Sequence, residues 1–165
     1  MSKFLIKVKK ARWENIPDFV PIDDVAADCV ADLRIEGNSL SVWLVEDDQS
    51  NVDRVLVALA ARCQSISNAD YALFDDSVPA DLGLKIQLSV GQTPDEHANG
   101  WHRDLVQLTG LQLVRLAGRI VQTARIDRIT EKRMAQLLRD ALRNGRLDQV
   151  KVDNSLLIKL ELRQK

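Results

Sequence analysis

Two groups of acidic residues stand where predicted strands end. They are Glu46, Asp47, Asp48, Asp75 and Asp76. The strands are predicted over 39–45 and 71–74, and the most strongly predicted helix of the chain, over 51–66, lies between them. In a strand–helix–strand unit the two strands run parallel, so both acidic groups would lie at one edge of a sheet, where α/β sheets tend to bind ligands.

Carboxylates gathered at such an edge have three interpretations. Acids just before a helix complement its dipole and cap it. An acidic edge also suits the binding of a basic protein partner. Carboxylates and water are, in addition, the ligands that Mg²⁺ prefers when it assists phosphoryl chemistry. The sequence leaves all three open.

Basic residues concentrate near the C-terminus, on or beside two predicted helices. They are Arg115, Arg119, Lys132, Arg133, Arg139, Arg143 and Arg146. We predict these helices over 110–125 and 131–143, joined by residues 126–129, and a β-hairpin over 150–162 after them. Two helices and a hairpin look somewhat like a winged-helix DNA-binding unit. The other interpretation is a solvated helix face, because acids interrupt the basic residues and no aromatic residue lies among them.

The densest group of titratable side chains surrounds the two histidines and comprises Asp95, Glu96, His97, His102 and Asp104. A histidine between carboxylates suits acid–base chemistry, but solvated loop residues give the same pattern. The segment 102–105 matches the first residues of a protein-kinase catalytic loop. We reject that match, because Thr109 stands where the loop requires Asn and no glycine-rich loop is present.

The two cysteines, Cys29 and Cys63, are far apart and sit in apolar company. Zinc sites normally show closely spaced cysteine pairs, so we expect buried apolar thiols, no metal site and a reducing compartment. Serine elbows, phosphate loops, dinucleotide loops and the zinc-protease motif are all missing from the sequence. We therefore expect no cofactor and no catalytic residues, although an unfamiliar enzyme class stays open.

The predicted elements indicate an α+β fold. A half-buried strand spans 4–8, and a hairpin joins 28–36 to 39–45 through a turn at Gly37-Asn38; a helix over 23–32 is the alternative. Ser50 and Asp53 resemble a capping box for the helix over 51–66, which should bury three side chains, namely Leu56, Leu59 and Cys63. A further strand alternates over 84–90. The expected architecture is a mixed sheet covered by helices, with a more helical, basic C-terminal part that ends in the hairpin.

Composition is that of an ordinary globular protein: 165 residues, 45% hydrophobic, 28% charged and a net charge of −1. The charge is unevenly divided, because residues 1–100 carry 9 basic and 17 acidic side chains and residues 101–165 carry 14 and 7. We expect either an acidic lobe over 1–95 and a basic lobe over 96–165, or one continuous domain. No signal peptide or membrane span is predicted, so the expected location is the cytoplasm.

These observations favour a non-catalytic cytoplasmic protein that binds another protein, of the inhibitor, immunity or accessory kind, through the five acids at the sheet edge. One alternative is a nucleic-acid-binding protein that uses the basic C-terminal helices and hairpin. Another is a metal-dependent hydrolase that uses the acidic edge. The sequence says nothing about the oligomeric state.

Overall fold

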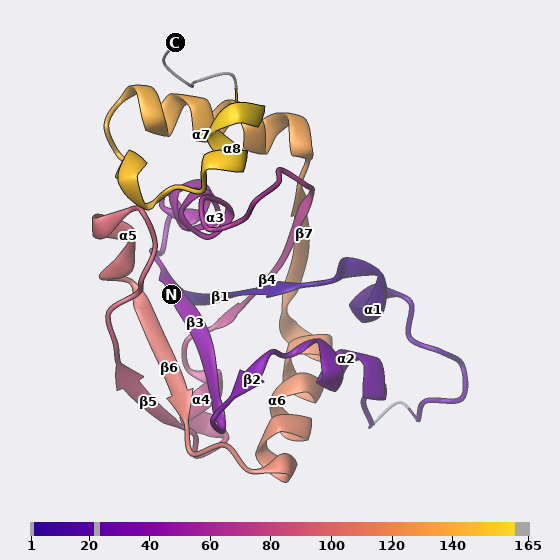
Figure 1. Cartoon of the computed structure of the whole chain (residues 1–165). Coiled ribbons are helices and arrows are strands. Elements are labelled where there is room, and N and C mark those ends of the chain that lie inside the picture. The colour runs from indigo at the N-terminus through magenta and orange to yellow at the C-terminus, as the bar shows by residue number, and fades with distance from the viewer. Residues whose placement is uncertain (1, 22–23, 161–165) are drawn as a thin grey trace.

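A seven-stranded antiparallel sheet forms the centre of the computed structural model, which describes residues 2–21 and 24–160. Six strands follow one another in the order β5-β6-β3-β1-β4-β7, and β2 pairs with β3 (Figure 1). The strands are β1 (Lys3–Val8), β2 (Ile35–Glu36), β3 (Ser39–Val45), β4 (Ala69–Asp75), β5 (Lys85–Leu88), β6 (His102–Val106) and β7 (Arg125–Ile129). The expected α+β class is confirmed.

Helices cover both faces of the sheet. One face carries α3 (Val52–Ala60), α5 (Glu96–Asn99), α7 (Glu131–Arg143), the 3₁₀ turn η1 (Gln149–Lys151) and α8 (Asn154–Lys159). The opposite face carries α1 (Lys10–Glu14), α2 (Ala27–Asp32), α4 (Val78–Asp81) and α6 (Gly110–Thr123). Strand β1 lies in the middle of this arrangement: Leu5 packs toward the α3 face, whereas Phe4 and Ile6 pack toward the α6 face. Burial on both faces follows from the alternation of side chains along a strand.

The unit β3–α3–β4 has the direction expected from the sequence. Strands β3 and β4 both pair antiparallel with β1, so they run parallel to each other with β1 between them. The last residues of the two strands, Val45 and Asp75, are both register partners of Lys3. The two acidic groups therefore follow strands that end at the same edge of the sheet, one strand apart.

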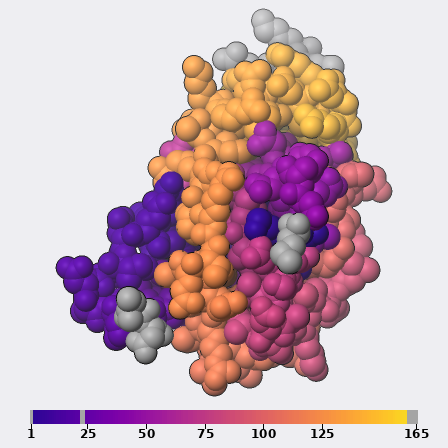
Figure 2. Space-filling model, turned by 180° about the vertical axis from the view of Figure 1, so that it is seen from behind, coloured from indigo at the N-terminus to yellow at the C-terminus, as the bar shows by residue number. Residues whose placement is uncertain are grey.

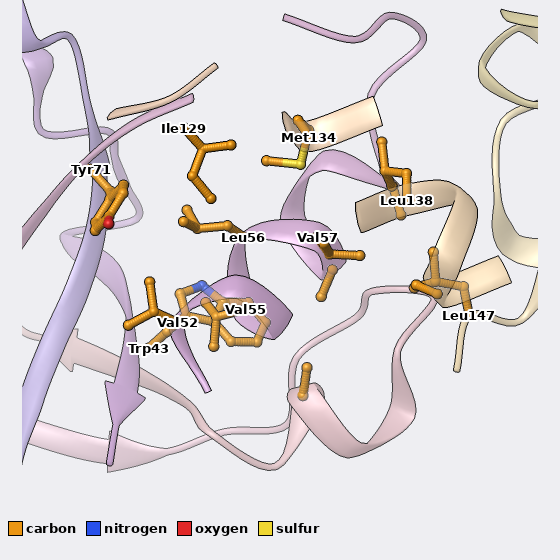
Figure 3. Packing of buried hydrophobic residues seen from close by; sticks show 14 of the residues in the cluster. Trp43, Val52, Val55, Leu56, Val57, Tyr71, Ile129, Met134, Leu138 and Leu147 are labelled. Carbon is orange, nitrogen blue, oxygen red and sulfur yellow. The ribbon is translucent and has the colours of Figure 1, made fainter. Parts of the chain in front are cut away.

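Helix α3 is shorter than predicted, because it ends at Ala60 rather than near residue 66. Its predicted capping box is wrong. The N-cap position is Asn51, whose side chain joins the backbone of Leu44 and Glu46, and the Ser50 hydroxyl donates to the Glu46 carboxylate. Figure 3 shows Leu56 and Val57 of α3 directed toward residues of β7 and α7, and Leu56 is fully buried. Leu59 and Cys63, which we expected to be buried, are half-buried.

The predicted strand over 28–36 is mostly wrong, since only Ile35 and Glu36 pair with β3. Residues 27–32 form α2, within the range 23–32 of the alternative helix. Tertiary contacts explain the difference: the buried Asp32 carboxylate accepts hydrogen bonds from the backbone N–H of Lys9 and from the indole of Trp13. These bonds fix the end of α2 beside the end of β1. The turn at Gly37-Asn38 is confirmed, with φ angles of 58° and 59°.

The C-terminal third also differs from the prediction. Residues 125–129, expected as part of a helix and its connection, form β7, and residues 102–106 form β6, which the sequence did not indicate as a strand. The predicted hairpin over 150–162 is wrong as far as residue 160: η1 and α8 stand there, and Leu162 lies outside the described residues. Leu156 and Leu160 are both buried, at the i,i+4 spacing of a helix rather than the period of a strand.

The two oppositely charged parts of the chain share the sheet. Strands β6 and β7 come from the basic part and pair with β3 and β4 of the acidic part. Ion pairs cross between the parts as well: Asp53 with Arg133, Asp70 with Arg128, and Asp81 with Arg119. Seen from behind, residues around 110–130 form a strip between the N-terminal segment and residues 50–90 (Figure 2). Part of the charge asymmetry is therefore neutralised within the molecule.

Candidate functional site

The edge of the sheet at β5 exposes a stripe of apolar side chains. Ile86, Leu88 and Val90 have 44%, 74% and 77% of their surface accessible. Ile86 and Leu88 point to one face of the strand, because they lie opposite Leu105 and Arg103 of β6. Val90 is at the next alternate position in the sequence, two residues after the end of β5. No charged residue occurs from Ile86 to Val90.

The opposite edge of the same sheet is built differently. In β7, Arg125 pairs with Asp127 at 2.6 Å and Arg128 pairs with Asp70 at 2.5 Å. Helix α1 also packs against this edge. Charged side chains and covering elements are the means by which proteins prevent an edge strand from pairing with another chain. Strand β7 has these means. At β5 the charged side chains beside the apolar stripe are Lys85, whose ammonium donates to Gln107, and Arg103 of β6, the register partner of Leu88; helix α4 also contacts the strand.

A row of polar side chains lies on the other face of β5 and its neighbours. The Nδ1 of His102 is 2.9 Å from the Ser89 hydroxyl, and its Nε2 is 3.8 Å from Oδ1 of Asp104, which accepts a hydrogen bond from Ser41. Burial lowers the pKa of His102, and Arg103 and Arg62 act in the same direction, while Asp104 opposes the shift. The imidazole is thus neutral near pH 7 and half-buried against the ring of Trp43.

The five acids predicted to bind a partner lie where the sequence analysis placed them, after β3 and after β4. The three that follow β3 are exposed, and Asp75 and Asp76 are half-buried. Donors of the same chain already engage several of these carboxylates: Lys3 donates to Asp75 at 2.6 Å, Ser2 to Asp47, and Ser50 to both Glu46 and Asp48. The hydrogen bond from the Ser50 backbone also lowers the pKa of Asp48. These bonds hold the loops at the ends of the two strands.

The seven basic residues of the nucleic-acid alternative do not share one surface. Arg115 and Arg119 belong to α6, and the others belong to α7 or follow it, on the opposite face of the sheet. Figure 1 shows these two helices at opposite ends of the molecule, separated by β7. Several of the side chains have partners: Arg119 pairs with Asp81, Arg133 with Asp53, and Arg139 donates to the backbone of Leu160.

The region around the histidines is held by a buried network. Asp95 is 1% exposed and accepts two hydrogen bonds from Arg54, at 2.7 and 2.8 Å, and one from the backbone N–H of Ala98. Burial alone would raise the pKa of Asp95, but the hydrogen bonds from Arg54 and Ala98 outweigh it, so the pKa lies below the ordinary value. The side chains of Thr93 and Asn99 bond to each other in the same loop. This network gives Asp95 a structural role.

In the part of the chain that the structure describes, we see no arrangement of side chains suited to metal or thiol chemistry. No group of three or more His, Cys, Asp or Glu side chains is placed to hold a metal ion there. Cys29 is buried and Cys63 half-buried, both as free thiols, and burial raises the pKa of Cys29. Within residues 2–21 and 24–160, no helix has the length and apolar character that crossing a bilayer requires.

No protein-family model, curated protein or solved structure matches this chain. The strand predicted over 84–90 forms over Lys85–Leu88, but its accessibility was not predicted. A signal was present: apolar residues at alternate positions with no charge between Ile86 and Val90.

Proposed function

We propose that this protein is a non-catalytic interaction factor that binds an extended segment of another protein along β5. The observation that carries the proposal is the difference between the two edges of one sheet. The β7 edge has charged side chains in ion pairs and a covering helix, whereas the β5 edge has three accessible apolar side chains and no charge from Ile86 to Val90.

The chemistry of an open edge supports this mode of binding. An extended peptide that adds a strand gains main-chain hydrogen bonds, and alternate side chains give the contact its specificity. Here the alternate side chains are Ile86 and Leu88, with Val90 following, so the matching partner segment carries apolar residues at every second position. The five acids near the ends of β3 and β4 remain a secondary surface for a basic partner, because most of them have donors within the chain.

The test is an affinity measurement with any partner that the wild-type chain captures, using the double variant Leu88→Lys/Val90→Lys. We expect at least a tenfold loss of affinity, of the order of 1.4 kcal/mol, because two ammonium groups would have to be buried in an apolar contact. The matched control is Val150→Lys, since Val150 is 93% exposed and lies outside β5. Hydrogen exchange should also show new protection of the amides of residues 85–90 in the complex.

Two outcomes would contradict the proposal. In the first, the partner binds the double variant and the wild type equally, which places the contact elsewhere. In the second, the purified wild-type chain forms dimers that the double variant abolishes, which means that the edge pairs with a second copy of the chain. Circular dichroism of the variant establishes that the fold is retained.

A further inference from the structure

A groove opens where the sheet divides on one side of β3. Strand β1 pairs with β3 only from Trp43 to Val45, and β2 pairs with Ser39 and Leu40 on the same side. Ser41 and Val42 have a register partner in β6 but none on the side of β1 and β2. Figure 1 shows β1 and β2 diverging from β3. The groove between them has a volume of about 570 Å³, within the range of small-molecule sites.

Three cations from three separate segments of the chain line this groove. Lys7 comes from β1, Arg34 from the segment between α2 and β2, and Arg62 from the turn after α3. All three are exposed, and within residues 2–21 and 24–160 none of them has an ion pair or a side-chain hydrogen bond. Many other arginines of the chain do have a carboxylate partner, for example Arg54 with Asp95 and Arg128 with Asp70. The positive charge of the groove is thus not used within the molecule.

The rest of the groove is lined by both polar and apolar side chains. Ser39 and Ser41 contribute hydroxyls, Glu36 and Asp104 contribute carboxylates, and Trp43 and Leu59 contribute apolar surface. Carboxylates accept hydrogen bonds from hydroxyl groups, whereas they repel a ligand that is anionic along its whole length. The groove therefore suits a ligand with an anionic end and an uncharged, hydroxyl-bearing body.

We propose that this groove binds a small organic phosphate, with the phosphate on Lys7, Arg34 and Arg62 and the hydroxyls of the body toward Glu36 and Asp104. A phosphate monoester carries a charge of about −1.5 to −2 at pH 7, so several cations can each stabilise it. A carboxylate carries a single charge, which one cation would neutralise. The guanidinium fork matches the geometry of phosphate oxygens. This site is separate from β5, and the inference does not rest on the function proposed above.

The test is isothermal titration calorimetry in phosphate-free buffer at low ionic strength with three probes: ribose 5-phosphate, glucose 6-phosphate and adenosine monophosphate. We expect at least one of them to bind the wild-type chain, and binding to weaken about tenfold or more in the double variant Arg34→Gln/Arg62→Gln, because each guanidinium supplies charge-assisted hydrogen bonds. The control variant, Arg115→Gln/Arg143→Gln, removes two exposed arginines that also have no ion pair in the described chain and should bind as the wild type does.

Three results would overturn the inference. In the first, no probe binds at about 10 mM, a concentration far above the Kd of a specific pocket. In the second, the two double variants bind the probe equally, and in the third, free ribose binds as tightly as ribose 5-phosphate. Amide chemical shifts supply an independent measurement, since a ligand in the groove should perturb Ser39 and Ser41. The variant Leu88→Lys/Val90→Lys should keep full affinity for the phosphate, so that failure here and failure of the strand-addition proposal are distinguishable.

Discussion

At the scale of single residues, Asp95 shows how one buried charge organises a loop. Its carboxylate receives both hydrogen bonds of the Arg54 fork and caps α5 through the N–H of Ala98. A buried pair contributes little compared with apolar residues of the same shape, but removing one partner leaves an uncompensated charge inside the protein. The loop around residues 91–100 is therefore held by this carboxylate together with the hydrogen bonds between Thr93 and Asn99.

The substitution Asp95→Asn should lower the free energy of unfolding by roughly 3 kcal/mol, the lower end of the range for breaking a buried pair, because Arg54 keeps part of its hydration. Denaturant unfolding measures the change. The matched control, Asp53→Asn, breaks the exposed pair with Arg133 and should cost at most about 1 kcal/mol. Since the pKa of Asp95 is lowered by folding, its contribution is complete above about pH 4 and is lost as the pH falls below that value. Equal losses in both variants would contradict this role.

His102 gives a second prediction, on pH. Burial lowers its pKa in the folded protein, so the unfolded chain binds a proton more readily than the folded one. The free energy of unfolding should therefore decrease as the pH falls from about 7.5 to 5.5, around the ordinary histidine pKa near 6.5. Urea unfolding of His102→Gln across this interval should show a smaller decrease than the wild type. An NMR titration that placed the His102 pKa above 6.5 would rule out this sign.

At the scale of elements, α3 is the helix on which the packing of one face depends. Its residues Val55, Leu56 and Val57 are buried between the sheet and α7 (Figure 3). Leu59, one turn further on, is only half-buried and lines the groove at the division of the sheet. The helix is thus packed as far as Ala58, and its end, at Leu59, borders a ligand-sized opening.

This difference within α3 is measurable. Leu56→Ala should cost about 3–5 kcal/mol, because Leu56 is 1% exposed and its removal leaves a cavity. Leu59→Ala should cost about half as much or less, since solvent already reaches its side chain. Chemical denaturation of the two variants gives the comparison. If Leu59→Ala proves the more destabilising, the packed face of α3 has been assigned to the wrong residues.

At the scale of the whole molecule, the sheet joins the two oppositely charged parts of the chain. Strands β6 and β7 of the basic part each pair with a strand of the acidic part, and three ion pairs cross between the parts. Exposed pairs stabilise a protein by little, so the shared strands and cores hold the parts together. Neither part has all the strands of the sheet by itself.

We therefore expect a single unfolding transition. Differential scanning calorimetry of the full chain should show one peak whose calorimetric and van't Hoff enthalpies agree, because separating the parts would break the β3–β6 and β4–β7 pairs at the same time. Two resolved transitions would instead mean that the acidic and basic parts fold as independent domains.

Local patterns in the sequence determined one turn and several helices of this protein. The Gly37-Asn38 turn forms as predicted, and helices over residues 52–60, 110–123 and 131–143 form within the predicted ranges 51–66, 110–125 and 131–143. Each of these features depends on residues within a few positions of one another, through backbone dihedrals, side-chain caps or the period of one helix face. Such signals need no knowledge of the rest of the fold.

Tertiary structure alone decided the features on which both functional inferences rest. Whether residues 85–90 lie in the middle or at the edge of the sheet depends on strand order, which alternation within one segment does not specify. The gathering of Lys7, Arg34 and Arg62 at one groove depends on β1 and β2 sharing one side of β3. For residues 27–32 the sequence left a strand and a helix open; the helix forms, and distant groups, Lys9 and Trp13, bond to Asp32 at its end. Long-range pairing and burial set these outcomes, because their free energies come from residues that are neighbours only after folding.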